Sequence, residues 1–201
     1  VPNTDADWFR SSGLKLDERG YVTVDGYGRT NLDGVWALGD ITPGHALAHR
    51  AFEQGITIAE KIAGADPKPV IDDTVPQVVF SFPEAASVGL TLDQAKALED
   101  VVEPKETAYP MLSNARMLMS GEGGSMTVVS GAFANNPDMQ VVLGVHIVSP
   151  IASDLIAEAE QLVGNRVPLA DAARLIHPHP TFSETLGEAL LKADGRPLHT
   201  R

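Results

Sequence analysis

The chain has 201 residues and a formal net charge of −12, because it contains 27 acidic and 15 basic side chains. This acidic balance argues against binding to nucleic acids or anionic membranes, which requires a basic surface. No apolar run reaches the length of a membrane span and no signal-peptide pattern opens the chain, so we expect a cytoplasmic protein. The absence of cysteine excludes disulfides, thiolate metal sites and a cysteine nucleophile within these residues.

The first third of the chain is predicted to combine short strands with one long helix. Residues 5–14 form a short amphipathic piece, and residues 21–24 and 35–38 are predicted strands. The second strand, Val-Trp-Ala-Leu, is a continuous apolar run, which is typical of a strand buried on both faces of a parallel sheet. A helix with an apolar stripe is predicted from residue 46 to residue 63. These patterns indicate a piece of an α/β domain.

Two features beside this predicted helix suit a bound ligand. The apolar run ends at Gly39 and Asp40, where a glycine lets a ligand approach the backbone and a carboxylate accepts hydrogen bonds from hydroxyls. The helix begins at Ala46, Leu47 and Ala48 without an obvious capping hydroxyl, so its first N–H groups and positive dipole end are available to negative charge. By itself, Gly-Asp after a strand is more often a turn than a site.

A short polar segment with two prolines, residues 65–69, is the one convincing domain boundary. We expect residues 1–67 to form one domain and residues 70–201 another. Beyond the boundary, strands are predicted at 75–82, 103–109, 125–131 and 140–148, with a hairpin loop at 134–138. Helices are predicted at 91–98, 151–163 and 168–175. This order of elements predicts an α+β fold in which helices pack on an antiparallel sheet.

The stretch that points most directly to chemistry is Ile-His-Pro-His-Pro-Thr-Phe-Ser-Glu, residues 176–184. Two His-Pro steps disfavour helical dihedrals just before an apolar-periodic helix. The Glu184 carboxylate could therefore fold back on a ring nitrogen of His179. Such a bond fixes the imidazole tautomer and favours the protonated ring, as a general acid/base near neutral pH requires. Alternatively, Thr181 and Glu184 form an ordinary capping box and perform no chemistry.

The remaining histidines are interpreted as structural. His177 and His146 are expected to be satisfied packing residues, and His49 to pack beside the start of the first long helix. No cluster of His, Asp and Glu has metal-ligand spacing, so no metal site is predicted.

Several motifs resemble one known family. His-x-His-Pro-Thr-x-x-Glu, followed by Leu-Gly-Glu-Ala and a Gly-Arg-Pro-Leu-His tail, resembles the end of the dihydrolipoamide dehydrogenases among the flavin-dependent pyridine nucleotide-disulfide oxidoreductases. Thr-Asn-x-x-Gly-Val-Trp-Ala-Leu-Gly-Asp with the following Leu-Ala-His resembles the flavin-contacting segment of that family. Pro-Gln-Val-Val-Phe-Ser-Phe-Pro-Glu, Ser-Asn-Ala-Arg and Val-Leu-Gly-Val-His-Ile-Val resemble its dimerisation domain. The resemblance covers nearly the whole chain.

The resemblance implies a role for individual residues. His179 would be the acid/base, lent by one subunit of a homodimer to the active site of the other, and Glu184 would hold it. Asp40 would bind the ribityl hydroxyls of FAD, while a helix N-terminus would face the flavin ring. The resemblance further implies NAD as co-substrate and lipoyl-bearing subunits of 2-oxoacid dehydrogenase complexes as partners. The positions that carry over as cofactor contacts are Gly39, Asp40, Leu47 and Ala48.

Val-Pro-Asn-Thr does not look like a natural start, so we expect a fragment in which residues 1–67 end an FAD-binding domain and residues 70–201 form the dimerisation domain. The family's Cys-x4-Cys and Gly-x-Gly-x-x-Gly motifs are absent from these residues. We therefore expect the chain to be inactive alone and to expose apolar surface on residues 35–38 and the helix after them. Two alternatives remain: the same region of a sibling reductase acting on mycothione, another disulfide or a quinone, and a stand-alone, non-catalytic dimerisation module.

Overall fold

The computed structural model describes residues 2–200, which divide into two compact units, one ending at Asp72 and the other beginning at Asp73. The regular elements of the first unit are α1 (Asp7–Arg10), the 3-10 turn η1 (Gly39–Ile41) and α2 (Ala48–Ile62). The long helix predicted at residues 46–63 is therefore confirmed, with slightly narrower bounds.

The prediction of two strands in the first unit is wrong. Among its described residues, sheet-like pairing is limited to single bridges, between Leu16 and Val22 and between Arg29 and Trp36. Leu38, at the end of the apolar run, is 38% exposed. An apolar run is buried on both faces only where neighbouring strands and covering helices are present. The described part of this unit supplies the apolar run with one bridge, at Trp36, and no sheet.

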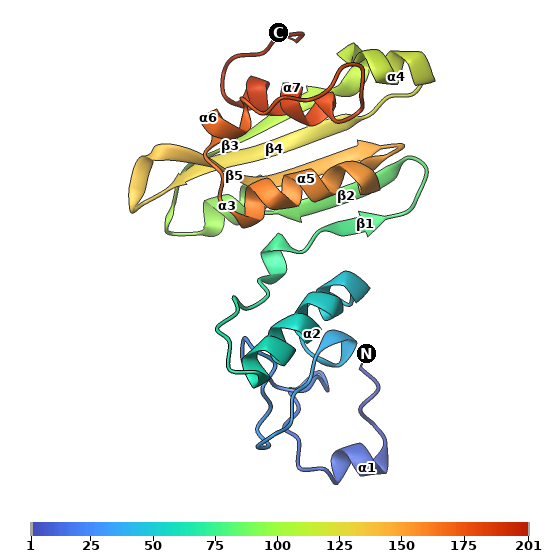
Figure 1. Ribbon diagram of the computed structural model, residues 1–201, viewed down its shortest axis with the longest axis vertical. Coiled ribbons are helices and arrows are strands. Elements are labelled where there is room, and N and C mark those ends of the chain that lie inside the picture. Colours follow the sequence, from blue (N-terminus) through green and yellow to red (C-terminus); the bar gives the residue numbers. More distant parts are fainter. Residues whose placement is uncertain (1, 201) are drawn as a thin grey trace. The chain divides into compact units, whose positions relative to one another are not determined.

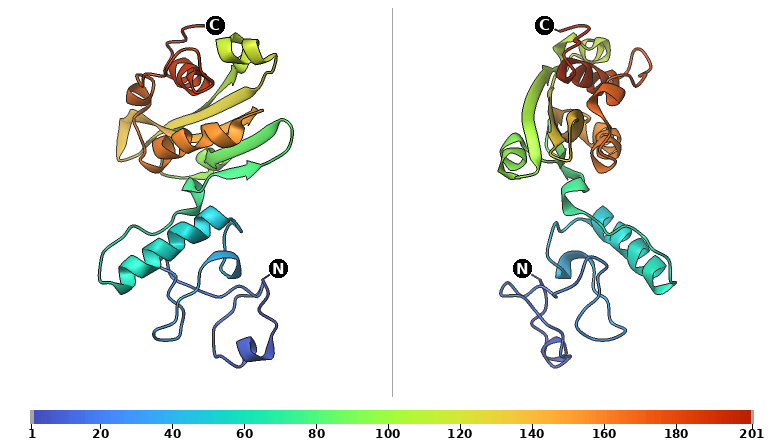
Figure 2. Two further views of the ribbon diagram at one scale, coloured as in Figure 1. Left: turned by 45° about the vertical axis from the view of Figure 1, so that its right-hand side comes forward. Right: turned by 90° about the vertical axis from the view of Figure 1, so that its left-hand side faces the viewer.

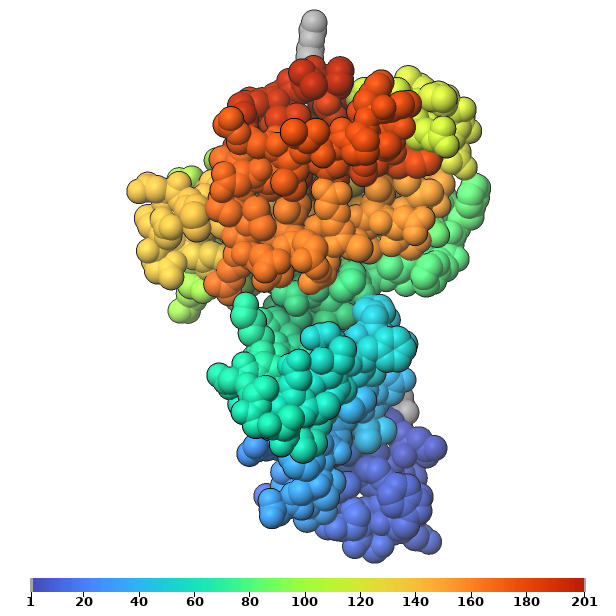
Figure 3. All heavy atoms as spheres, viewed as in Figure 1, coloured from blue at the N-terminus to red at the C-terminus, as the bar shows by residue number. Residues whose placement is uncertain are grey.

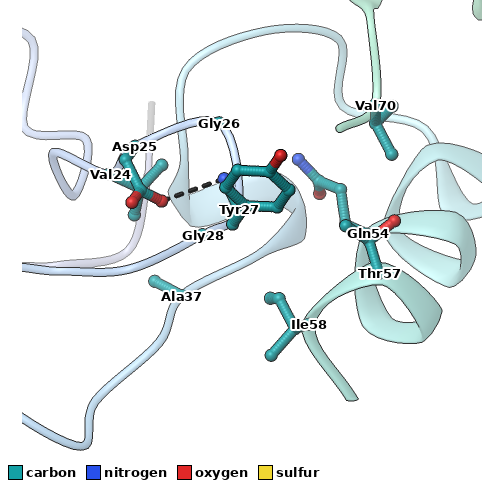
Figure 4. A pocket seen from close by; sticks show the side chains of 10 residues that line it. All are labelled: Val24, Asp25, Gly26, Tyr27, Gly28, Ala37, Gln54, Thr57, Ile58 and Val70. Atoms are coloured by element: carbon teal, nitrogen blue, oxygen red, sulfur yellow. Dashed lines mark hydrogen bonds between the residues drawn. The ribbon is translucent and has the colours of Figure 1, made fainter. Parts of the chain in front are cut away.

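Helix α2 packs through one face and exposes another. Gln54 and Ile58 line a gap between the helix and the turn that carries Tyr27 (Figure 4). The gap measures about 30 Å³, which is room for one water, so it is a packing gap rather than a ligand site. On another face of the helix, Phe52 and Ile56 are 70% and 53% exposed. The prediction that this helix exposes apolar surface is confirmed.

The second unit contains a five-stranded antiparallel sheet in the order β1-β2-β5-β4-β3 (Figure 1). Its strands are β1 (Gln77–Val79), β2 (Glu84–Gly89), β3 (Val101–Pro110), β4 (Ser125–Phe133) and β5 (Asn136–Ser149). The predicted α+β fold with an antiparallel sheet is confirmed.

The central strand β5 is apolar over most of its length because both of its faces are covered. Val141 and Leu143 pack with Val129 in one cluster, whereas Val145 and Ile147 belong to the larger cluster on the other side. The register between β4 and β5 shifts at Leu143, so a β-bulge changes which face the alternating side chains reach.

Three parts of the sheet differ from the sequence pattern. The strand predicted at 75–82 is shorter, because β1 comprises only Gln77–Val79. Strand β2 was not predicted, because the three small residues at 85–87 have low strand propensity and lie next to a proline. It forms because it pairs with β5 along its whole length. The hairpin loop predicted at 134–138 is shorter, because β5 begins at Asn136, opposite Phe133.

Helices cover both faces of the sheet. Helices α5 (Ala152–Gly164), α6 (Leu169–Ala172) and α7 (Glu184–Ala193) lie on one face, and α3 (Leu92–Ala97) lies on the other (Figure 2). Helix α4 (Ala115–Ser120) follows β3 in the chain. The helix predicted at 168–175 is shorter than expected, whereas those predicted at 91–98 and 151–163 are confirmed.

The main core of the second unit lies between the sheet and its three C-terminal helices. In Figure 3 the atoms of these helices, orange and red, cover this face of the unit. Side chains that are almost completely buried in this core include Tyr109, Met117, Met126, Ile147, Leu186 and Leu190.

No helix among residues 2–200 combines the length and the apolar content needed to cross a membrane.

Candidate functional site

The structure brings His179 and Glu184 together. His179 Nδ1 lies 2.9 Å from Glu184 Oε1, at the point where the chain enters α7. A carboxylate can only accept a hydrogen bond, so Nδ1–H is the donor. In the neutral ring Nε2 then carries the lone pair and can take a proton. The His179 side chain is 71% exposed, so this nitrogen is accessible from outside the subunit.

Glu184 uses its two carboxylate oxygens for different partners. While Oε1 accepts from His179, Oε2 accepts from the backbone N–H of Thr181 at 2.8 Å. The Thr181 hydroxyl donates to the Pro178 carbonyl at 2.6 Å, and the N-cap of α7 is Ser183. Only half of the predicted capping box is therefore present. The capping contact and the contact with His179 therefore coexist, because each uses a different carboxylate oxygen of Glu184.

Electrostatics keep Glu184 ionised. Burial by itself would raise the pKa of this carboxyl group, but the hydrogen bonds from the Thr181 backbone and from His179, together with the charges of His179 and His177, lower it below its ordinary value. At neutral pH the group is therefore a carboxylate that can hold the His179 ring in one orientation.

Asn114, for which the sequence predicted no role, supports the same loop from another element. Its side-chain Nδ2 donates to the Thr181 carbonyl at 3.1 Å, and its Oδ1 accepts from the Met117 N–H at 3.0 Å as the N-cap of α4. Asn114 is 5% exposed. Next to it, the Arg116 guanidinium lies 5.5 Å from the centre of the Phe182 ring. The cap is recognisable in the sequence, but the contact with Thr181 is not.

His146 and His177, the two histidines of the second unit that were interpreted as structural, have hydrogen-bond partners. His146 Nε2 lies 3.2 Å from the Leu90 carbonyl. His177 Nε2 lies 2.8 Å from Glu158 Oε1.

The four positions that resemble flavin contacts lie in the first unit. Gly39 is buried and adopts a left-handed backbone with φ +70°, and its N–H donates to Gln54 Oε1 of α2 at 2.8 Å. Asp40 follows within η1 and is exposed. Leu47 is the extended N-cap of α2 and its side chain forms no capping bond before Ala48, the first helical residue. The absence of a side-chain cap agrees with the sequence prediction.

A buried arginine, unexpected from the sequence, fixes the loop before α2. Arg50 is 5% exposed, and its Nε donates to Asp72 Oδ1 at 2.6 Å while Nη2 donates to the Pro43 carbonyl at 2.6 Å. Its side chain runs beside Gly44, where any Cβ would overlap the guanidinium. A lone arginine in an amphipathic helix gives no signal that it is buried.

Comparison with known proteins covers both units. A family described as "Pyridine nucleotide-disulphide oxidoreductase, dimerisation domain" matches residues 75–190, and one described as "Pyridine nucleotide-disulphide oxidoreductase" matches residues 1–55. Dihydrolipoyl dehydrogenase from Cupriavidus necator is 41% identical over 201 residues, which span 99% of this chain and 40% of that protein. The enzyme of the same name from Bacillus subtilis is 38% identical over 185 residues, or 92% of this chain and 38% of that protein. The chain thus spans about two fifths of these relatives.

Solved structures agree with this assignment. The crystal structure of LpdA from Mycobacterium tuberculosis superposes with a TM-score of 0.85 at 31% identity, covering 96% of this chain and 41% of that one. The flavoprotein disulfide reductase RclA from Escherichia coli shares the fold, with a TM-score of 0.76 at 23% identity over 94% of this chain and 42% of that one. The chain belongs to the pyridine nucleotide-disulphide oxidoreductases and contains their dimerisation domain.

Proposed function

We propose that this chain is part of a flavin-dependent dihydrolipoyl dehydrogenase, which oxidises protein-bound dihydrolipoamide and reduces NAD. In this proposal the second unit supplies the dimer interface and the acid/base, and the first unit supplies part of the FAD site. The observation that carries the proposal is the exposed His179 ring, held by the carboxylate of Glu184. The names of the relatives that match the full chain support the choice of substrate.

The proposed role of His179 is to move a proton at Nε2. A thiolate, and not a thiol, attacks a disulfide, so a dithiol substrate must lose a proton before it reacts. His179 Nε2 takes that proton, while the bond from Nδ1–H to Glu184 stabilises the imidazolium that forms. The exposure of the ring fits a base that acts on a group outside its own subunit, as the resemblance to the family implies.

The first unit fits a flavin at the four positions that carry over from the family. The exposed Asp40 carboxylate can accept bonds from ribityl hydroxyls, and the left-handed Gly39 beside it leaves little room for a side chain, since an added Cβ would stand 3.3 Å from Ala51 Cβ. The N-terminus of α2, with Leu47 and Ala48, begins without a side-chain cap. When bound, FAD would pass electrons between the redox-active disulfide and the nicotinamide.

The partners proposed for the chain are a second copy of itself and lipoyl-bearing subunits of 2-oxoacid dehydrogenase complexes. The match of residues 75–190 to a dimerisation domain supports the first. Because the 201 residues contain no cysteine, the proposal also requires that the redox-active disulfide lies outside them. The chain by itself is accordingly expected to have no dihydrolipoamide activity.

A chimaeric enzyme tests this function. Residues 1–201 replace the matching segment of the Cupriavidus necator dihydrolipoyl dehydrogenase, and dihydrolipoamide-dependent reduction of NAD is measured. We expect activity in the chimaera and a loss of about 100- to 10,000-fold in His179→Gln, the range for removal of a general acid/base. His199→Gln is the matched control, because His199 also pairs with a glutamate, Glu188, at 2.7 Å. Activity there should stay within twofold of the parent, on the order expected for a surface change.

The control measurements separate folding from chemistry. Flavin absorbance and the mass of the native assembly report whether the chimaera binds FAD and dimerises. A flavin-loaded dimer that is inactive on dihydrolipoamide but reduces another disulfide would replace the proposed substrate. A loaded, active dimer in which His179→Gln has no effect would refute the acid/base role.

A further inference from the structure

The segment that leads to His179 turns one side chain into the rest of its unit. From Arg174 to Pro180 every side chain except that of His177 is exposed, and Ile176 is 97% exposed. The His177 side chain is 9% exposed. His177 is therefore the inward-facing anchor of the near side of the loop.

His177 lies between α5 and α7. On the α5 side its Nε2 is 2.8 Å from Glu158 Oε1, and because a carboxylate can only accept, Nε2–H is the donor. On the α7 side the ring lies beside Gly187, where an added Cβ would stand 2.6 Å from Nδ1. Any larger residue at 187 would displace the ring, so the glycine determines how deeply His177 enters the space between the helices.

Charge strengthens this anchor. The hydrogen bond to Glu158 raises the pKa of His177 against the opposing effect of burial, and the charge of Glu158, a bond to the Leu175 backbone and the charge of Glu184 raise it further. The carboxylates that act on the ring thus come from both helices packed against it, α5 and α7. A hydrogen bond between a charged imidazole and a carboxylate is about twice as strong as a neutral one.

The far side of the loop is held separately. Thr181 is fixed through its carbonyl by Asn114 and through its N–H by Glu184. Loss of the anchor at His177 would therefore loosen the residues before Pro178, while α7, its first turn and the bond from the Thr181 hydroxyl to the Pro178 carbonyl stay in place.

We propose that His177 is a positioning residue. Its bond to Glu158 and its contact with Gly187 determine where the backbone places the His179 ring relative to Glu184. This inference rests on the proposed role of His179 as the acid/base. It adds a second histidine–glutamate pair, of the buried His177 and the partly exposed Glu158, behind the exposed one, and gives the first histidine of the motif a function beyond packing.

The test compares Glu158→Gln with Glu188→Gln in the 201-residue chain. Both substitutions preserve side-chain size and remove a carboxylate that bonds a histidine, but Glu188 bonds His199. Nitrogen-15 NMR of the imidazoles reports the His179 tautomer, and hydrogen exchange reports the bond from the Thr181 N–H to Glu184.

In Glu158→Gln we expect the neutral His179 ring to shift from the Nδ1–H tautomer toward the Nε2–H form that free imidazole side chains prefer. Exchange of the Thr181 amide should stay near the wild-type rate, because Asn114 and Glu184 hold the far side of the loop independently of His177. Glu188→Gln should match the wild type in both readouts. Gly187→Ala, which displaces the ring without removing a charge, should reproduce the change in tautomer.

An unchanged His179 tautomer in Glu158→Gln would overturn the proposal. Equal changes in both glutamate variants would overturn it too, because a general loosening of α7 would then explain them. In the chimaeric enzyme, Glu158→Gln should lower kcat with little change in KM. If His179→Gln leaves that enzyme fully active, the proposed function fails, while the NMR comparison still decides whether His177 positions the ring.

Discussion

The two compact units bury apolar side chains to different degrees. In the second unit, one cluster reaches from Ala86 in β2 to Leu190 in α7 and joins the sheet to four helices, α4 to α7. In the first unit the cluster contains three buried side chains, Phe9, Val22 and Ala37. Phe52 on α2 is 70% exposed.

The difference shows that apolar runs and an amphipathic helix do not by themselves form a hydrophobic core. Both units contain apolar runs and an amphipathic helix, but only the second has a hydrogen-bonded sheet on which its helices can pack. An amphipathic helix gains most of its stability from such packing. The exposed apolar face of α2 is therefore the kind of surface that a further protein layer would cover.

The largest expected effect comes from truncating one apolar residue in each unit. Leu190→Ala removes a fully buried side chain and should lower the free energy of unfolding of the second unit by about 2–5 kcal/mol. Phe52→Ala should change the stability of the first unit by no more than about 0.5 kcal/mol, because its ring is already solvated. Both are measured by urea denaturation of the chain.

The two tryptophans, Trp8 and Trp36, lie in the first unit, so their fluorescence reports that unit alone. The Tyr109 ring resonances in NMR spectra report the second. A large loss of first-unit stability in Phe52→Ala would contradict the comparison, because it would show that α2 buries this face within the chain.

A smaller effect is expected from the buried arginine, on which the first unit depends in place of a large core. Arg50→Ala leaves Asp72 and the Pro43 carbonyl without their donor. Breaking a buried ion pair costs about 3–5 kcal/mol, and because the Asp72 side chain is 39% exposed we expect about 1–3 kcal/mol here. Tryptophan fluorescence during thermal unfolding measures the change. Arg50→Lys keeps the charge but not the forked geometry of the guanidinium. Its stability should therefore lie between that of the wild type and that of Arg50→Ala.

The smallest expected effect is a pH dependence in the stability of the second unit. The pKa of His177 is raised above its ordinary value of 6.5, mainly by the bond to Glu158. Its stabilising contribution is therefore complete below pH 6.5 and is lost as the pH rises through the folded-state pKa. The melting temperature of the second unit should fall across this window, and Glu158→Gln should flatten the fall.

Glu184 contributes with the opposite sign. Its pKa is lowered below 4.5, so its contribution is present above that pH and is lost as the pH falls through the folded-state pKa. The two windows do not overlap, which allows them to be measured separately. A melting temperature in the wild type that does not change above pH 6.5 would contradict the charged state assigned to His177.

Local sequence was sufficient where the deciding contacts are close along the chain. The bond between His179 and Glu184 spans five positions, and the capping box of Thr91 and Gln94 at the start of α3 spans three. Such contacts follow from a helix start and from the residue types that satisfy its first N–H groups. The long apolar run of β5 similarly predicted a buried strand.

Predictions from the sequence were wrong where contacts with other segments determine the secondary structure. Strand β2 has weak propensity and exists because β5 pairs with it, while the apolar run ending at Leu38 has good strand propensity and forms one bridge. Strand formation requires a partner, and a pattern within one segment does not reveal whether the partner is present.

By itself, the sequence determined the α+β class of the second unit, the family motifs and the pairing of His179 with Glu184. The tertiary structure decided what holds that pair. Asn114 reaches Thr181 across 67 positions and Glu158 reaches His177 across 19. These contacts join residues whose spacing has no periodic meaning, and they form because α4, α5 and α7 pack as parts of one unit around the sheet. Local propensity and periodicity encode which elements form, whereas the neighbours of a side chain are set by how those elements pack.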